Sequence, residues 1–196
     1  MLDDVEGLKE VWDKGKAVHC MFCHGYENRD KKLAQLGLNP MVVHVLGGIG
    51  TLSKDVTVLT NEPVGASDPK VMDAVKSLGF SIIEGKVEST KLTHDDDKVE
   101  IAVKDAGKTT FDVLLWTPST TVSEGVRPLL DNLGLQVKSG SMPINEYVEP
   151  INPMGKTSVP GVFVAGDIQT PMKSVSMALA SGSIAGAFAH FDFGHL

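Results

Sequence analysis

Two cysteines stand three residues apart in the segment HCMFCHGYE, residues 19–27, and a histidine lies beside each of them. Cys20 and Cys23 are the chain's only cysteines, so they act as a pair or not at all. Thiol and imidazole groups at this spacing serve three kinds of chemistry: a redox dithiol, a metal site or the attachment of haem. In a redox dithiol the thiolate is the reactive form.

Two of these alternatives meet obstacles elsewhere in the sequence. The order C-x-x-C-H is that of c-type haem attachment, which needs export, and the start MLDDVEGLKE has no apolar signal core. A zinc site would have to use His19, Cys20, Cys23 and His24 together, whereas structural zinc sites draw on two separate ligand pairs. These obstacles weigh against a small zinc or haem protein, which stays open as an alternative to a redox dithiol.

A second stretch, VPGVFVAGDIQTPMKSVSMALASGSIAGA at 159–187, joins a strand pattern to a Gly-Asp corner and a helix of small residues. Gly166 permits close approach to a pyrophosphate, and the Asp167 carboxylate can accept hydrogen bonds from ribityl or ribose hydroxyls. The positive helix start favours the pyrimidine edge of a flavin, which becomes negative on reduction. The residues at that helix start are Lys173, Ser174, Val175 and Ser176.

The elements that must hold these residues follow from periodicity and capping signals. Met41 to Leu52 is predicted as a helix opened by Pro40, so its glycines are not read as a dinucleotide fingerprint. Strands are expected at 56–60 and in three segments between 81 and 116, and a domain junction is expected at 117–120. The other predicted elements are helices at 4–15, 68–79, 127–135 and 174–191, the last mostly buried, and a strand at 162–165.

The composition is that of a globular protein. The chain has 196 residues, of which 42% are hydrophobic, and a net charge of −7. An acidic chain is a poor partner for nucleic acid or an anionic membrane, and no apolar run is long enough to span a bilayer. These features, with the missing signal core, favour a cytoplasmic protein.

The two motifs together resemble thioredoxin-reductase-like flavoproteins, the class II pyridine nucleotide-disulfide oxidoreductases. The CxFCHGYE wording is most similar to the fungal branch, whose members oxidise dithiols of secondary metabolites. The resemblance implies an α/β, Rossmann-type FAD/NAD(P)-binding fold with two domains, homodimers, and a small dithiol or protein disulfide as substrate. It implies that Cys23 faces the flavin and that Cys20 exchanges with substrate. His24 is the candidate acid/base, because histidine exchanges protons near neutral pH.

The resemblance also leaves parts of the family pattern unmatched. The GxGxxG half of the flavin domain should precede residue 1, so an N-terminal truncation and weak or no FAD binding by this chain alone are expected. In DKKLAQLGLNP, Lys31 and Lys32 interrupt the expected strand and only Gly37 remains of a glycine loop, so NADPH binding is not expected. We therefore expect an incomplete two-domain fold. The alternative function is that of a non-catalytic paralogue, which binds a full-length relative in a mixed dimer. The predicted divisions are 1–16 (a helix leading from the flavin domain), 17–116 (the nucleotide-type domain with the CxxC) and 117–196 (the C-terminal flavin domain).

Overall fold

The computed structural model describes residues 5–95, 97–140 and 145–194. Its contacts divide the chain into two compact units, Met1–Pro118 and Ser119–Leu196, and each is described by itself. The segment expected to lead from a flavin domain lies in the first unit, where Leu8 and Val11 of its helix are buried. The functional assignment of 1–16, 17–116 and 117–196 stays a prediction.

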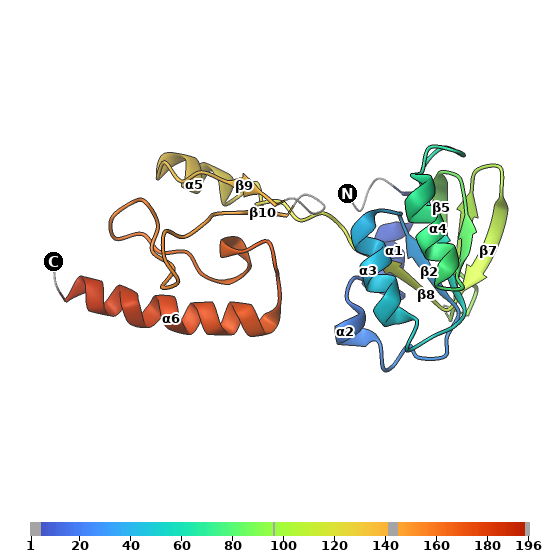
Figure 1. Ribbon diagram of the computed structural model, residues 1–196, viewed down its shortest axis with the longest axis horizontal. Coiled ribbons are helices and arrows are strands. Elements are labelled where there is room, and N and C mark those ends of the chain that lie inside the picture. The colour runs from blue at the N-terminus through green and yellow to red at the C-terminus, as the bar shows by residue number, and fades with distance from the viewer. Residues whose placement is uncertain (1–4, 96, 141–144, 195–196) are drawn as a thin grey trace. The chain divides into compact units, whose positions relative to one another are not determined.

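The first unit is built on a five-stranded parallel sheet with the order β1-β8-β2-β3-β4. The central strand β2 pairs with β8 on one side and with β3 on the other. The strands are β1 (Ala17–Val18), β2 (Leu33–Leu36), β3 (Val56–Leu59), β4 (Ser81–Ile83) and β8 (Val113–Trp116). This arrangement confirms the predicted α/β fold (Figure 1).

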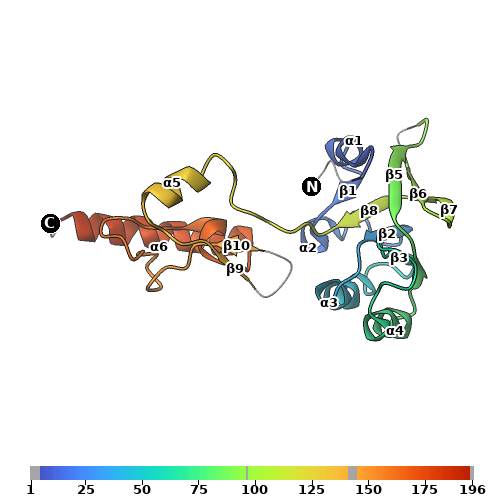
Figure 2. The same cartoon turned by 90° about the horizontal axis from the view of Figure 1, so that it is seen from above.

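Layers cover both faces of this sheet (Figure 2). Helices α3 (Pro40–Ile49) and α4 (Pro69–Ser77) lie on one face, and α1 (Leu8–Asp13) lies on the other beside a three-stranded antiparallel sheet. That smaller sheet consists of β5 (Val87–Leu92), β6 (Val99–Val103) and β7 (Gly107–Phe111). In β8, Leu114 packs toward the smaller sheet while Val113 and Leu115 pack toward α3, because successive strand residues face opposite sides.

The helix starts of the first unit follow the predicted capping signals. Asn39 accepts a hydrogen bond from the amide of Val42 at 3.0 Å, and Pro40 occupies the first turn of α3. Asp68 caps α4 in the same way, with Pro69 after it. Proline fits here because the first amides of a helix have no partner within it. The segment 41–52 is thus largely helix, and its glycines belong to α3 and the turn that ends it.

One expectation for this unit is wrong. Lys31 and Lys32 were expected to interrupt a strand, yet β2 begins directly after them and is the central strand of the sheet. Leu33 and Ala34 are fully buried, and β2 forms parallel ladders on both sides. The lysines precede the buried stretch, so they do not oppose it.

The second unit has little regular structure and a small core. Its elements are α5 (Arg127–Asn132), β9 (Lys138–Ser139), β10 (Glu146–Tyr147), the 3₁₀ turn η1 (Gly166–Gln169) and α6 (Val175–Phe193). The core consists of Val122, Leu130, Leu135, Val148 and Val164. Among the described residues, no helix is long and apolar enough to cross a membrane.

Two further expectations are corrected in the second unit. Residues 162–165 form no strand; Phe163 makes a single bridge with Lys156, because turns at Gly161 and Gly166, both at positive φ, leave too short a segment. Helix α6 was expected to be mostly buried, but its buried side chains are Ser181 and Ala185. The small-residue pattern correctly predicted the helix, but it wrongly indicated that most of the helix is buried within this chain.

Candidate functional site: a CxxC disulfide and a Gly-Asp corner

The cysteine pair lies at the carboxyl end of β1, at an edge of the parallel sheet where α/β proteins commonly bind ligands. Cys20 and Cys23 form a disulfide with their Cα atoms 5.3 Å apart. Cys20 precedes the one-turn helix α2 (Met21–His24), and its Sγ accepts a hydrogen bond from the amide of Cys23 at 3.1 Å. The same amide can stabilise a thiolate on Cys20 once the disulfide opens.

Three contacts anchor this turn to the first unit. Met21 is buried, and Asn28 donates from its amide nitrogen to the carbonyl of His24 at 2.7 Å. Gly25 packs so closely that a Cβ would lie 2.3 Å from the Met21 carbonyl and 2.5 Å from the Leu52 side chain. The glycine after CxxCH is therefore required by close packing, and α2 is held firmly although it has one turn.

The two sulfurs differ in their surroundings. Cys20 is partly buried and Cys23 is exposed in this chain, as is the imidazole of His24. Phe22, between the cysteines, is 97% exposed, and Tyr26 is 72% exposed with the Arg29 guanidinium 4.3 Å from its ring centroid. The disulfide thus lies on an open, partly aromatic surface that a substrate or another protein surface can approach.

His19, the residue before Cys20, lies beside Trp12, which in turn contacts the chain's second tryptophan, Trp116. The rings of Trp12 and His19 are 5.7 Å apart, and Trp12 meets Trp116 edge to face at 5.9 Å. Trp116 ends β8, and the register Val18–Leu115 places it level with His19. Among the described residues, no three His, Cys, Asp or Glu side chains converge as metal ligands.

The predicted flavin residues come together in the second unit. Gly166 has φ +78°, and a Cβ at this position would meet no atom within 4 Å, so its backbone is open to close approach. Its amide donates to the Ser181 hydroxyl at 2.9 Å, which ties the corner to α6. Ser174 caps α6 by accepting from the amide of Met177 at 3.2 Å. The first amides of a helix have no internal acceptor, so those of Val175 and Ser176 suit an electronegative ring edge.

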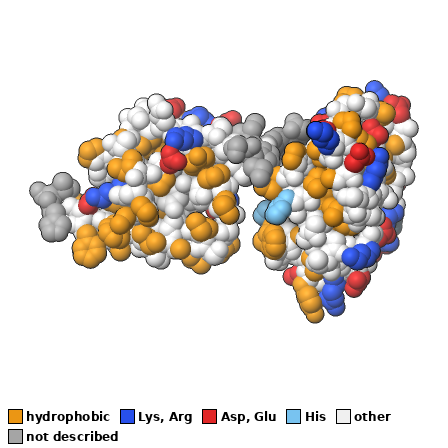
Figure 3. Space-filling model, viewed as in Figure 1, with side chains coloured by type: hydrophobic (Ala, Val, Ile, Leu, Met, Phe, Trp, Pro, Cys, Tyr) orange, Lys and Arg blue, Asp and Glu red, His pale blue; other side chains and the backbone are white. Residues whose placement is uncertain are grey.

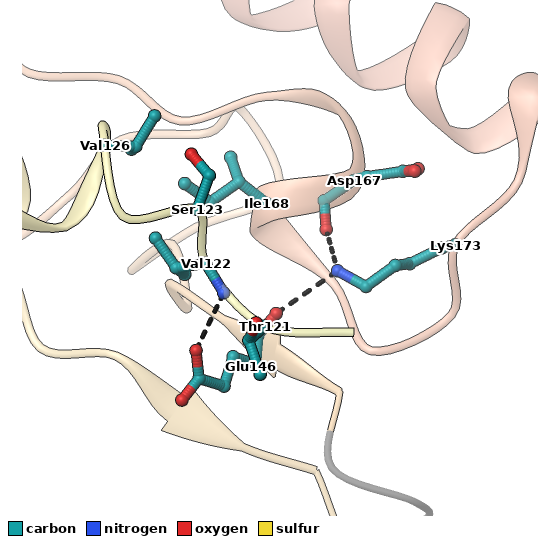
Figure 4. A pocket seen from close by; sticks show the side chains of 8 residues that line it. All are labelled: Thr121, Val122, Ser123, Val126, Glu146, Asp167, Ile168 and Lys173. Atoms are coloured by element: carbon teal, nitrogen blue, oxygen red, sulfur yellow. Dashed lines mark hydrogen bonds between the residues drawn. The ribbon is translucent and has the colours of Figure 1, made fainter. Parts of the chain in front are cut away.

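Lys173 lies at a cavity of about 220 Å³ beside this corner (Figure 4). Its ammonium donates to the backbone carbonyls of Asp167 at 2.7 Å and Glu146 at 3.2 Å. The exposed Asp167 carboxylate points away from that ammonium. Glu146 in turn accepts from the Val122 amide at 2.7 Å and pairs with Arg127. These hydrogen bonds hold the backbone of the corner in place. They leave the Asp167 carboxylate to accept hydrogen bonds from hydroxyl groups.

These residues fit one edge of a flavin nucleotide. An open glycine, an outward carboxylate and a capped helix start provide a close approach, two acceptor oxygens and backbone donors. Gln169 adds a buried Oε1 without a hydrogen-bond donor in the described part of the chain. The structure thus brings Gly166, Asp167 and the predicted 173–176 segment into one region.

The turn between β2 and α3 does not fit a dinucleotide pyrophosphate. Of the fingerprint glycines only Gly37 is present; Asn39 and Val42 occupy the next two positions. Pro40 has no N–H, and the Asn39 side chain already occupies the Val42 amide. Two backbone donors at this helix start are thus not available to a phosphate.

Sequence reasoning missed several supporting residues. Ser181, Gly25 and Asn28 hold the two motifs, and Glu146 shapes the cavity at Lys173. For Ser181 the sequence carried a partial signal, because its spacing of four residues from Ala185 places both on the same helix face. The structure shows that both are buried. Glu146 gave no signal, because its role depends on a distant backbone amide.

Comparison with known proteins agrees with these motifs. No protein-family model matches the chain. The thioredoxin reductase tcpT of Claviceps purpurea is 30% identical over 191 residues, which are 95% of this chain and 57% of that protein. Over the aligned residues the chain is similar to thioredoxin reductases. A thioredoxin reductase of Gibberella zeae is 26% identical, with 93% of this chain and 59% of that protein covered.

Solved structures carry the same fold. The crystal structure of HlmI superposes on this chain with a TM-score of 0.79 and 24% identity, covering 98% of this chain and 56% of HlmI. The chain thus spans less than two thirds of the length of these relatives. The activity, substrates and partners of the whole relatives are therefore matters for proposal.

Proposed function

We propose that the thioredoxin-reductase-like chain performs thiol–disulfide exchange through Cys20 and Cys23, as the redox centre of a FAD-dependent oxidoreductase. The observation that carries this proposal is the accessible disulfide on an anchored turn at the sheet edge, where the Cys23 amide can stabilise a Cys20 thiolate. A small-molecule dithiol is the proposed substrate class, with a protein disulfide as the alternative. The fungal relatives are named thioredoxin reductases, which supports the redox class and, by that name, the protein-disulfide alternative.

The proposed exchange balances without a further reactant. One substrate thiolate attacks Cys20, the bond between the two sulfurs breaks, and Cys23 leaves as a thiolate. The second substrate thiolate then attacks the mixed disulfide, which releases the oxidised substrate and leaves both cysteines reduced. His24 accepts a substrate proton, since its imidazole is exposed one residue after Cys23. FAD, when bound at Gly166, Asp167 and the 173–176 helix start, supplies the acceptor for the two electrons.

A single-turnover assay tests the exchange without FAD. The oxidised chain is mixed with excess dithiothreitol, and two new protein thiols per chain are expected to form rapidly. Cys20→Ser and Cys23→Ser variants should each remove the turnover, because neither can form the disulfide; with oxidised glutathione in place of dithiothreitol, Cys23→Ser should form a mixed disulfide on Cys20 and release one reduced glutathione. Faster mixed-disulfide formation by Cys23 in Cys20→Ser than by Cys20 in Cys23→Ser would reverse the roles of the two sulfurs. Exchange no faster than that of an unstructured CMFC peptide would overturn the proposal.

A matched pair of variants tests the proton acceptor. His24→Gln should slow exchange by roughly 10²-fold near neutral pH, which is an ordinary contribution of general base catalysis. His19→Gln provides the control, because His19 packs against Trp12. Equal effects of the two substitutions would contradict the assignment. The visible spectrum of the purified chain, before and after incubation with FAD, separately tests flavin binding.

A second function is favoured by a different observation. The exposed apolar side chains of α6 give the second unit a surface suited to another polypeptide. We propose, as the second candidate, that the chain acts as an interaction partner of flavoprotein relatives. Thiol exchange and association are measured separately, so either proposal can fail alone.

A further inference from the structure

Helix α6 exposes large hydrophobic side chains along its whole length (Figure 3). Val175 is 77% exposed, Leu179 69% and Phe191 60%. Large apolar side chains gathered in this way on a protein surface often mark a binding site. From Val175 to Phe191, the helix contains no Asp, Glu, Lys or Arg. Whatever covers α6 therefore presents an apolar surface to it.

The exposed residues lie on two separate faces of α6. At about 100° per residue, they fall on opposite sides of the helix, with the buried Ser181 and Ala185 between them. The first face contains Val175, Leu179, Gly182, Gly186 and Phe193, and the second contains Met177, Ile184, Phe188 and Phe191. We call these sets the glycine face and the aromatic face.

The glycine face is shaped for close backbone approach. Gly182 and Gly186 are one helical turn apart, and a Cβ at either position would meet nothing within 4 Å. Glycine within a helix is less favourable than alanine, so these positions weaken α6 without serving any contact in the described chain. Small residues at this spacing allow another backbone to pack closely against a helix. The glycine face thus fits a strand or helix at short range.

The two faces together identify the occupant. A helix that is apolar on opposite sides belongs inside a larger fold. Helix α6 of a second copy would cover one face and leave the other exposed. The relatives continue well beyond the matched region, since the chain covers 57% of tcpT and 56% of HlmI.

We propose that α6 docks a polypeptide segment of the kind that these relatives carry outside the matched region. The segment packs a backbone on Gly182 and Gly186 and an apolar layer on the aromatic face. This names the surface for the second candidate function and does not depend on thiol exchange.

Co-production with a defined probe tests the docking. The probe is the part of Claviceps purpurea tcpT outside the match, co-expressed untagged with the tagged chain. Expected results are co-purification at one to one and slower hydrogen exchange in α6. A probe that stays insoluble with the chain, or is soluble and does not co-purify, overturns the proposal. A chain that dimerises alone and loses the dimer on substitution in α6 assigns the surface to a second copy and also overturns it.

Surface variants identify the docking faces. Leu179→Asp on the glycine face and Phe191→Asp on the aromatic face should each weaken co-purification at least tenfold. Ile151→Asp is the matched control, because Ile151 is 67% exposed in the same unit and lies outside α6. Circular dichroism of each variant checks that the fold is kept. Equal effects of the control and α6 variants, or no effect on one face, would contradict docking through both faces.

Discussion

The two units of the chain use hydrophobic residues in opposite ways. In the first unit, apolar residues from both faces of one sheet are buried in two clusters, and regular strands place the cysteine pair at an edge. In the second, five residues form the core while its longest helix, α6, stays largely exposed. The first unit is thus organised by its own contacts, whereas the second keeps its site in shape through local polar ties. Composition alone does not reveal this difference.

The largest expected effect tests whether the first unit is stabilised independently. Leu114 is fully buried, so Leu114→Ala should reduce the free energy of unfolding by about 2–5 kcal/mol. Hydrogen exchange with mass spectrometry should locate the loss in Met1–Pro118. The control, Leu130→Ala, should act on the second unit only. Equal loss of protection in both units would show that they unfold together and weaken the comparison.

The next effect tests the local ties of the second unit. A Cβ at Gly155, which has φ +80°, would lie 2.5 Å from the Val164 carbonyl. Gly155→Ala should therefore destabilise the second unit by about 1–3 kcal/mol, measured by urea unfolding. Gly161→Ala isolates the steric part, because Gly161 has φ +75° and open space around it. Similar losses of unfolding free energy in both variants would show that the backbone shifts to relieve the close contact at Gly155.

A smaller effect concerns the carboxylate between β7 and β8. Burial opposes ionisation of Asp112, but the Lys32 amide at 2.8 Å and the Lys98 ammonium at 3.4 Å hold its pKa below the usual value. A lowered folded pKa gives stability that is present above the unfolded value of 3.8 and is lost as pH falls through the folded value. Asp112→Asn should cost about 1 kcal/mol at neutral pH, measured by urea unfolding, and less in acid. A loss independent of pH would assign the effect to packing.

The smallest effect has the opposite sign. Gly182→Ala should stabilise the second unit by about 0.5–1 kcal/mol, because alanine favours a helix and its Cβ meets no atom in the described structure. Thermal unfolding by circular dichroism measures the gain, and Gly186→Ala should behave alike. A destabilised variant would show that the glycine face is already occupied in the isolated chain.

The sequence predicted what local chemistry determines. Pro40, and Asp68 with Pro69, marked helix starts correctly, and alternation revealed the strands around Val99. It failed where position depends on distant neighbours. Lys32 looked unfavourable for a strand, yet β2 begins one residue later. The small residues of α6 indicated burial, but only Ser181 and Ala185 of the helix are buried in the described structure.

The tryptophan pair makes the first unit optically distinct. Both indoles of the chain, Trp12 and Trp116, lie in that unit, edge to face at 5.9 Å. Intrinsic fluorescence and the near-ultraviolet signal of coupled indoles therefore report on the sheet edge beside Cys20. The second unit gives no indole emission. A change in emission on reduction can thus be read, without any label, as an event at that edge.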